Sequence, residues 1–130
     1  MINIDKLIPK DKEDVSFIDD LKLMQIEDIR HIVPNLLEWI QDGNWIQAKL
    51  IVNYFSPHIN EIENEIITIL KGNDSTWKYW TLSSLIYHSD VKPSIKLLSV
   101  INDLYVNCSV LDKEEEIDIV ANEILEKYKK

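Results

Sequence analysis

Two similar turns are the feature of this sequence that most limits how the chain can fold. Only two glycines occur in 130 residues, and each is followed by asparagine and then by tryptophan, in the stretches DGNW and GNDSTW. A fold rich in β-hairpins needs many more glycines for its tight turns. Glycine after an amphipathic pattern is typical of a helix C-terminus, where it takes the left-handed conformation without a steric cost. We therefore expect Gly43 and Gly72 to end helices, and Gly43 to be left-handed.

Apolar side chains recur at helical spacing from about residue 14 to the end of the chain, so we expect an all-α fold of about six or seven helices. Asn44 and either Asp74 or Ser75 are expected to cap the helices that follow the two glycines. Ser56 and Pro57 are expected to begin another helix, because the N–H that proline lacks has no partner at that position anyway.

The C-terminal segment has the clearest one-sided pattern in the chain. We expect an amphipathic helix within residues 112–130, from about Lys113 to Tyr128. Its apolar stripe consists of Ile117, Val120, Ala121, Ile124, Leu125 and Tyr128. The length of the chain is that of a single domain, in which residues 1–13 are expected to form an extended lead-in.

An apolar doublet followed by a third apolar residue occurs three times, about 30 residues apart. The copies are Leu36-Leu37 with Ile40, Ile66-Ile67 with Leu70, and Leu97-Leu98 with Ile101. Any amphipathic helix can produce such a doublet, but the first two copies are also followed by the same turn and a tryptophan. Periods of this size are typical of stacked helical hairpins, so we expect residues 34–107 to form the repeating core.

The stretch LLEWIQDGNWIQAKLI resembles the HEAT repeat, in which an aspartate-rich turn and an aromatic or apolar residue precede the second helix of a hairpin. The matching residues are Leu36, Leu37, Ile40, Asp42, Asn44, Trp45, Ala48 and Leu50. The second copy departs from this pattern, because Trp80 stands where Ala48 does in the first. The resemblance implies a single HEAT-like domain over residues 1–130, folded as a short α-solenoid whose concave face suits an extended partner.

The chain as a whole is similar to a family of short bacterial proteins of unknown function. The similarity lies in the blocks LIPKDK at residues 7–12, LLEWIQDGNW at residues 36–45 and WKYW at residues 77–80. The resemblance implies a bacterial origin and adds no activity.

An excess of acidic residues limits the partners of this chain. With 23 acidic against 14 basic residues, the formal net charge is −9. Phosphate backbones and anionic membrane surfaces attract basic proteins, so we expect neither nucleic acid nor a membrane as a partner. We expect another protein instead, with basic residues on its surface.

Cysteine usage and the N-terminal sequence indicate the compartment. The single cysteine, Cys108, can form no internal disulfide, and the stretch MINIDKLIPKDKED lacks the apolar core of a signal peptide. No run approaches the roughly 18 apolar residues of a membrane span. We therefore expect a cytoplasmic protein, and a monomer. Cys108 lies among apolar residues and is expected to be a small buried hydrophobe rather than a catalytic thiol.

The motifs that usually carry chemistry are missing from this sequence. It contains no phosphate-binding loop, dinucleotide fingerprint or nucleophile elbow. Glu27 with His31 and His58 with Glu61 have the helical spacing of metal ligands, but such pairs are common on exposed helix faces. The acidic run at residues 114–116 is explained by the dipole of the helix that it begins. We expect no catalytic residue, no cofactor and no metal site.

The aromatic block WKYW has two interpretations. Trp77 and Trp80 lie one helical turn apart with further apolar residues around them, which indicates a central helix packed on two sides. Alternatively, the block lines a groove that anchors a partner, because tryptophan and tyrosine are the usual anchors of interfaces. The partner-binding residues would then be Trp77, Lys78, Tyr79 and Trp80.

The block LIPKDK also leaves two interpretations open. In the first, Leu7 and Ile8 dock the lead-in on the first helices. In the second, Lys10, Asp11 and Lys12 form part of a functional surface that binds the partner.

These observations favour a non-enzymatic, protein-binding helical-repeat module, of which a toxin-neutralising immunity protein is one form. The alternative is a small-molecule-binding or enzymatic domain with a pocket near Trp77 and Trp80. A deep pocket with converging histidine, aspartate or lysine side chains would favour that alternative. A third hypothesis is a structural part of a larger assembly, which predicts an exposed apolar patch and self-association.

Overall fold

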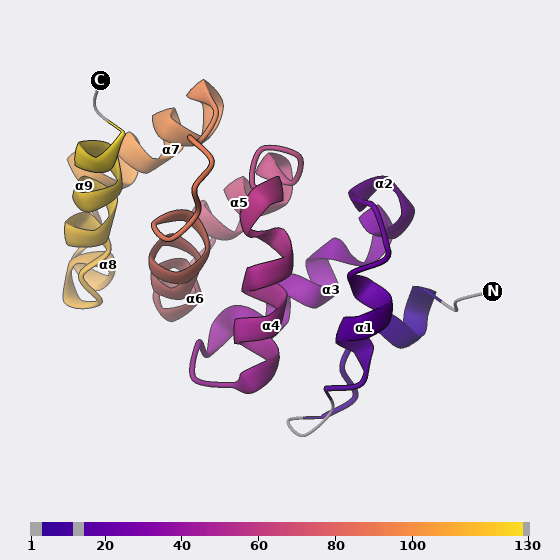
Figure 1. Ribbon diagram of the computed structural model, residues 1–130. Helices are drawn as coiled ribbons and strands as arrows, with labels where there is room; N and C mark the ends of the chain where they lie inside the picture. The colour runs from indigo at the N-terminus through magenta and orange to yellow at the C-terminus, as the bar shows by residue number, and fades with distance from the viewer. Residues whose placement is uncertain (1–3, 12–14, 129–130) are drawn as a thin grey trace.

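A computed structural model describes residues 4–11 and 15–128 of the chain. Within these ranges every regular element is helical and no strand occurs, which confirms the all-α fold expected from the sequence. The helices follow one another across the molecule in chain order, and the first and last of them lie at opposite ends (Figure 1).

The first third of the chain, as far as Gln41, consists of short helical segments. They are the 3-10 helices η1 (Ile4–Leu7), η2 (Arg30–Ile32) and η3 (Glu38–Gln41) and the α-helices α1 (Phe17–Leu21), α2 (Ile26–Ile29) and α3 (Val33–Leu37). The segment η1 lies within the lead-in that is expected to be extended. From α2 to η3 the backbone stays helical without a break. A capping box begins this run, in which Asp28 Oδ2 accepts the Gln25 N–H at 3.2 Å.

The rest of the chain, from Ile46 onward, includes the longer helices. They are α4 (Ile46–Phe55), η4 (Ser56–His58), α5 (Glu63–Leu70), α6 (Ser75–Trp80), the π-helical segment η5 (Thr81–Ile86), α7 (Ile95–Val106), α8 (Val110–Glu114) and α9 (Ile117–Lys127). The segments are more numerous than the six or seven helices expected, because 3-10 and π-helical stretches and one left-handed turn divide the longer helices. Within the described residues, none of these helices is both long and apolar enough to cross a membrane.

The apolar residues of the three repeated doublets belong to the core. All of them are buried except Leu98, which is half-buried. The stripe of α9 is buried at Ile117, Val120, Ala121 and Ile124. Burying one leucine or isoleucine side chain stabilises the fold by about 1.5–3 kcal/mol, so this shared core is the main force that holds the row of helices together.

Side-chain hydrogen bonds link parts of the described chain that lie 30 to 40 positions apart. Examples are Tyr54 to the Met24 carbonyl, Arg30 to the Glu61 carbonyl, Asn60 to the Lys92 carbonyl and Tyr128 to the Ser89 carbonyl. Each bond joins one helical unit to a later one, at a spacing close to the period of the sequence. The HEAT-like solenoid stays a prediction that this spacing supports.

Gly43 has a different role from the one expected of it. Neither glycine has a positive φ, so the left-handed conformation predicted for Gly43 is wrong. The ring of Trp80 lies against the backbone here, and a Cβ atom on Gly43 would stand 2.2 Å from Cε3 of Trp80. Glycine is needed because a later helix packs onto this turn, a contact that the local sequence does not reveal.

The caps of the two helices after the glycine turns differ. The prediction that Asn44 caps α4 is wrong, because Trp45 is the residue before the first turn and its side chain makes no capping bond. Asp42 braces this turn instead, since its Oδ1 accepts the Asn44 N–H at 2.9 Å. Asp74 caps α6 as expected, with its Oδ1 accepting the Trp77 N–H at 3.0 Å.

Two expected helix boundaries lie elsewhere. Helix α4 passes directly into the 3-10 segment η4, and Ser56, its first residue, has helical φ and ψ of −51° and −43°, so the backbone is not broken there and Ser56 is not the N-cap of a separate helix. Glu116 has a φ of 62° and divides the predicted C-terminal helix into α8 and α9. Glutamate gives no sequence signal for this left-handed turn, since glycine and asparagine are the usual residues there.

Candidate partner-binding surface

The block WKYW begins with a tryptophan that is turned inward. Trp77 is half-buried, and its indole N–H donates a hydrogen bond to the Leu37 carbonyl of α3 at 3.0 Å. The capping bond from Asp74 fixes the first turn of α6 and thereby the direction of this side chain. Trp77 thus ties α6 to α3, and beside it lies a small hollow of about 140 Å³.

Lys78 lies in the interior, where it forms an ion pair with Asp112 of α8. Lys78 Nζ is 2.9 Å from Oδ2 of Asp112, and the two side chains are 8% and 6% exposed. The Ser75 hydroxyl donates to the other carboxylate oxygen, Oδ1, at 2.5 Å. Burial by itself raises the pKa of Asp112, but the hydrogen bonds from Ser75 and Lys78 outweigh it, so the pKa lies below its usual value. This pair is structural, and we leave Lys78 out of the partner-binding surface.

Tyr79 and Trp80 complete the block. Their rings meet edge to face, with centroids 5.4 Å apart and planes at 82°. Tyr79 packs against the core, whereas Trp80 is half-buried over the backbone of Gly43. Trp80 therefore connects the block WKYW with the turn that precedes α4.

The lead-in is docked by its apolar residues and exposes its polar ones. Leu7 is buried and Ile8 packs against the core, as the docking interpretation of LIPKDK expects. Lys10 and Asp11 are exposed, and Lys12 lies outside the described residues. The second interpretation, in which these three residues contact a partner, stays a prediction.

A hollow of about 410 Å³ opens where the lead-in meets the turn before α4. Its lining consists of Asp11, Glu38, Trp39, Gln41 and Trp45. Gln47, which is buried in the first turn of α4, holds the lead-in in this place by donating from Nε2 to the Asp11 carbonyl at 3.2 Å. The rings of Trp39 and Trp45 meet edge to face, with centroids 5.6 Å apart and planes at 63°. Two tryptophans and two acidic residues thus line one open hollow.

Glu38, Trp39 and Gln41 were not predicted from the sequence as site residues. A signal was present, because Trp39 falls beside the apolar stripe of its own helix rather than within it. A large aromatic side chain outside the core face is a candidate anchor for a partner, since aromatic residues are enriched at interfaces.

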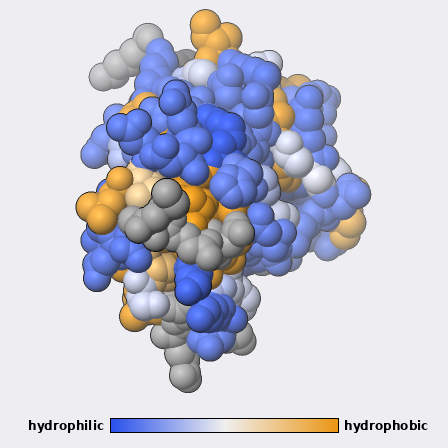
Figure 2. Space-filling model, turned by 90° about the vertical axis from the view of Figure 1, so that its right-hand side faces the viewer, coloured by the Kyte–Doolittle hydropathy of each residue, from blue (hydrophilic) through white to orange (hydrophobic). Residues whose placement is uncertain are grey.

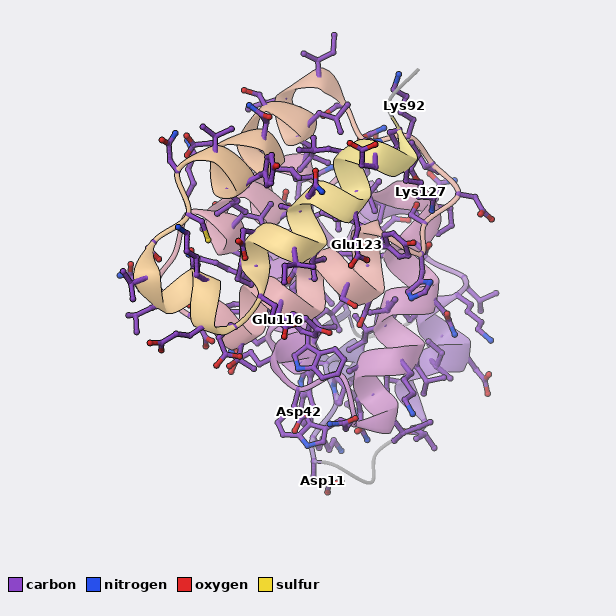
Figure 3. The ribbon with its side chains drawn as sticks, turned by 90° about the vertical axis from the view of Figure 1, so that its left-hand side faces the viewer. Asp11, Asp42, Lys92, Glu116, Glu123 and Lys127 are labelled. Carbon is purple, nitrogen blue, oxygen red and sulfur yellow. The ribbon has the colours of Figure 1, made fainter. Side chains whose placement is uncertain are left out.

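Two turns face the lower side of Figure 1: the turn between η3 and α4, and, farther to the left, the turn between α8 and α9. In Figure 3 the acidic residues Asp11 and Asp42 lie at the lower end, and Glu116 lies above them near the middle of the view. Lys92 and Lys127 lie at the other end of that view. We call these two turns, together with Asp11 and the hollow, the turn edge.

Comparison with known protein families shows where this chain belongs. A family model described as a domain of unknown function (DUF5071) matches residues 7–125. The chain belongs to this family. The match confirms the expected resemblance to a family of unknown function, while the individual blocks and the HEAT-like repeat stay predictions. A search of curated proteins finds none that matches.

A second polar hollow of this DUF5071 chain lies beside the buried ion pair. Its volume is about 400 Å³. Its polar lining includes Asn73, Lys78, Asp103, Asn107, Ser109 and Asp112. Lysine and aspartate side chains converge here, as a small-molecule site near Trp77 would require, although Lys78 and Asp112 are already paired with each other.

The histidines and the cysteine offer little chemistry in this DUF5071 chain. His58 Nδ1 is 3.2 Å from Glu61 Oε2, and in the part of the chain that the structure describes no group of three or more such side chains is placed to hold a metal. Cys108 is half-buried, and burial together with the carboxylates of Asp118 and Asp112 raises the pKa of its thiol. A thiol with a raised pKa is a poor nucleophile at neutral pH.

Proposed function

We propose that this chain is a non-enzymatic module that binds another protein, and that the turn edge contacts basic residues of that partner. The observation that supports this most is the hollow in which the acidic residues Asp11 and Glu38 lie beside the half-buried Trp39 and Trp45. Tryptophan side chains of this kind are frequent hot spots of protein interfaces, where they fill pockets from which water is excluded.

The charge of the turn edge fits a basic partner. A net charge of −9 attracts cationic surfaces, and Asp11 and Asp42 place negative charge at the lower end of Figure 3. Such attraction speeds encounter and weakens as salt is added, because ions screen it over about 8 Å at physiological ionic strength. At the other end, Lys127 is held internally, since its Nζ donates to the Ser89 carbonyl at 3.1 Å.

One finer form of this proposal is an immunity protein that neutralises a basic toxin in the bacterial cytoplasm. A monomeric α-solenoid of HEAT-like repeats gives such a module a long binding surface for its size. These points rest on the acidic charge, the single cysteine and the order of the helices rather than on the family match.

Capture of proteins from an extract of the native host on the immobilised chain tests this function. We expect a basic protein to be retained at low salt and to be lost from the variant Asp11→Lys/Glu38→Lys. The matched control Glu27→Lys/Asp90→Lys makes the same change of charge at exposed positions outside the turn edge, and it should retain the protein. Equal loss from both variants would assign the capture to overall charge and overturn the proposal.

The hollow beside Lys78 and Asp112 supports a second candidate function, the binding of a small polar molecule. Its lining offers several hydrogen-bonding groups around a buried charge pair, which is typical of ligand sites. An NMR titration with small polar metabolites would favour this function if the amides of Asn73 and Ser109 shift saturably and Asp103→Ala abolishes the effect.

Exposed apolar residues bear on the hypothesis of a larger assembly. Several lie toward the C-terminal end, namely Ile95, Tyr105, Val106, Val110, Leu111 and Ile119. The face at the N-terminal end is mostly hydrophilic, with small separate apolar areas (Figure 2). Self-association through the C-terminal end would support an assembly role, whereas light scattering that shows a monomer up to about 1 mM would exclude it.

A further inference from the structure

The hollow of the turn edge combines groups that complement one kind of side chain. Two of its walls are the indoles of Trp39 and Trp45, and two are the acidic residues Asp11 and Glu38. Glu38 is exposed, and its carboxylate has no hydrogen-bonding or ion-pair partner in the described part of the chain. An acceptor without an internal partner, next to aromatic rings, attracts a planar cation.

We propose that this hollow binds an arginine side chain of the partner protein. A guanidinium group stacks on an indole face, and its N–H groups can donate to the Glu38 carboxylate at the same time. A lysine ammonium is more strongly hydrated and lacks the planar face for stacking, so arginine is the better match. Because the arginine belongs to a partner protein, this inference rests on the function proposed above.

The geometry of the aromatic pair bears on how a cation can meet an indole face. Trp39 lies in η3 and Trp45 stands directly before α4, with ring planes at 63°. At this angle the edge of one ring meets the other, so the pair does not cover the faces of both indoles as face-to-face stacking would. An anionic or a neutral apolar ligand would have to lie against two acidic residues, which disfavours both.

The hollow is also held in shape before any partner arrives. Asp42 braces the turn between the two tryptophans through the Asn44 N–H, and the Trp80 ring packs against Gly43 in the same turn. On the other side, Gln47 fixes the lead-in through the Asp11 carbonyl. Because the site is already ordered, binding costs less conformational entropy, and more of the interaction energy appears as affinity.

An NMR titration with a short peptide tests the inference without the native partner. The probe is N-acetyl-Gly-Arg-Gly-amide, and the matched probe replaces arginine by neutral citrulline. We expect the indole N–H signals of Trp39 and Trp45 to shift with the arginine peptide, with a dissociation constant on the order of tens of millimolar. The indole N–H of Trp77 is bonded to the Leu37 carbonyl and should stay in place as an internal reference.

Variants connect the shifts to the hollow. Glu38→Gln is expected to weaken arginine-peptide binding about two- to fivefold and Trp39→Leu by a similar factor, while Glu27→Gln leaves it unchanged. An unmoved Trp77 signal in each variant shows that the fold is intact. Equal shifts with the citrulline peptide or with a lysine peptide, or no loss in Glu38→Gln, would overturn the inference.

The outcomes separate this inference from the proposed function. If a host protein is captured and its binding is the same in Glu38→Gln, the arginine site fails while protein binding stands. If the arginine peptide binds as expected but no basic host protein is retained by the turn edge, the arginine site stands and the proposed function fails.

Discussion

The two glycine turns look alike in the sequence and are held by different contacts. At Gly43 a Cβ atom would stand 2.2 Å from the ring of Trp80, whereas at Gly72 the nearest atoms are the carbonyl oxygens of Ile69 at 3.2 Å and Thr68 at 3.5 Å. The first turn is therefore shaped by a helix that comes later in the chain, and the second by its own helix. Similar turn sequences can thus depend on different parts of the molecule.

The residues that follow the two tryptophans extend this comparison. Ile46 comes directly after Trp45 and is 47% exposed, whereas Lys78 comes directly after Trp77 and is 6% exposed. The apolar residue is thus exposed and the charged residue is buried, which is the reverse of what hydrophobicity alone predicts. Lys78 can be buried because α8 supplies Asp112 as its partner. The neighbouring helix decides which side chain is buried, and a buried charge is tolerated only with its partner.

Breaking the buried ion pair should have the largest effect and should separate the two turns. Lys78→Ala leaves Asp112 without its cation, which is expected to lower the free energy of unfolding by about 3–5 kcal/mol. Ile46→Ala, at the matching position of the first turn, should cost less than about 1 kcal/mol. Urea unfolding of both variants measures the difference, and similar costs would contradict the structural role of Lys78.

Filling the glycine positions should have the next largest effect. Gly43→Ala is expected to destabilise the protein by about 1–3 kcal/mol, since the new methyl group overlaps the Trp80 ring. Gly72→Ala should change stability by less than about 1 kcal/mol, because its closest contact needs only a small shift. Thermal unfolding compares the stability of the two glycine variants. Adding Trp80→Leu to Gly43→Ala should recover part of the loss, and no recovery would argue against the ring contact.

Removing the polar side chains at the two turns should have a smaller effect. Asp74→Ala deletes the cap of α6 and is expected to cost about 1 kcal/mol. Asn44→Ala should stay within about 0.5 kcal/mol, because the bond at this turn uses the backbone N–H of Asn44, which alanine keeps. Urea unfolding measures the stability of both variants. A larger loss of stability for Asn44→Ala would indicate that Asn44 caps α4 after all.

The pH dependence of stability should reveal the contribution of the buried ion pair that follows the second turn. The folded state lowers the pKa of Asp112, so its ionised form adds stability above the unfolded pKa of about 3.9. That stability is lost as the pH falls below this value through the lower pKa of the folded state. We expect the unfolding free energy to fall less steeply in this acid range for Asp112→Asn, and an unchanged slope would count against the shift.

Local signals in the sequence predicted the fold class and some of the caps. The scarcity of glycine and the helical spacing of apolar residues were sufficient for an all-α fold, and Asp74 was found because its bond lies within one turn. The role of Gly43 was missed because it depends on Trp80, a distant residue. The left-handed turn at Glu116 was missed because nothing in that residue type signals it.

The candidate site was predictable to a smaller extent. The block LIPKDK pointed to Asp11, which lines the hollow of the turn edge. Lys78 was named as a partner-binding residue because nothing in its own segment indicates that Asp112 will meet it. Glu38 and Trp39 were overlooked because helical periodicity draws attention to the buried face, while a binding surface is built from residues beside it.

The side-chain hydrogen bonds that join residues 30 to 40 positions apart matter while the chain is being made. At about 5–20 residues per second, the later partner of such a bond is synthesised roughly two to eight seconds after the earlier one. A helix that leaves the ribosome therefore waits only a short time for the helix that covers it. Each apolar face would be exposed briefly and locally, which limits aggregation of the nascent chain.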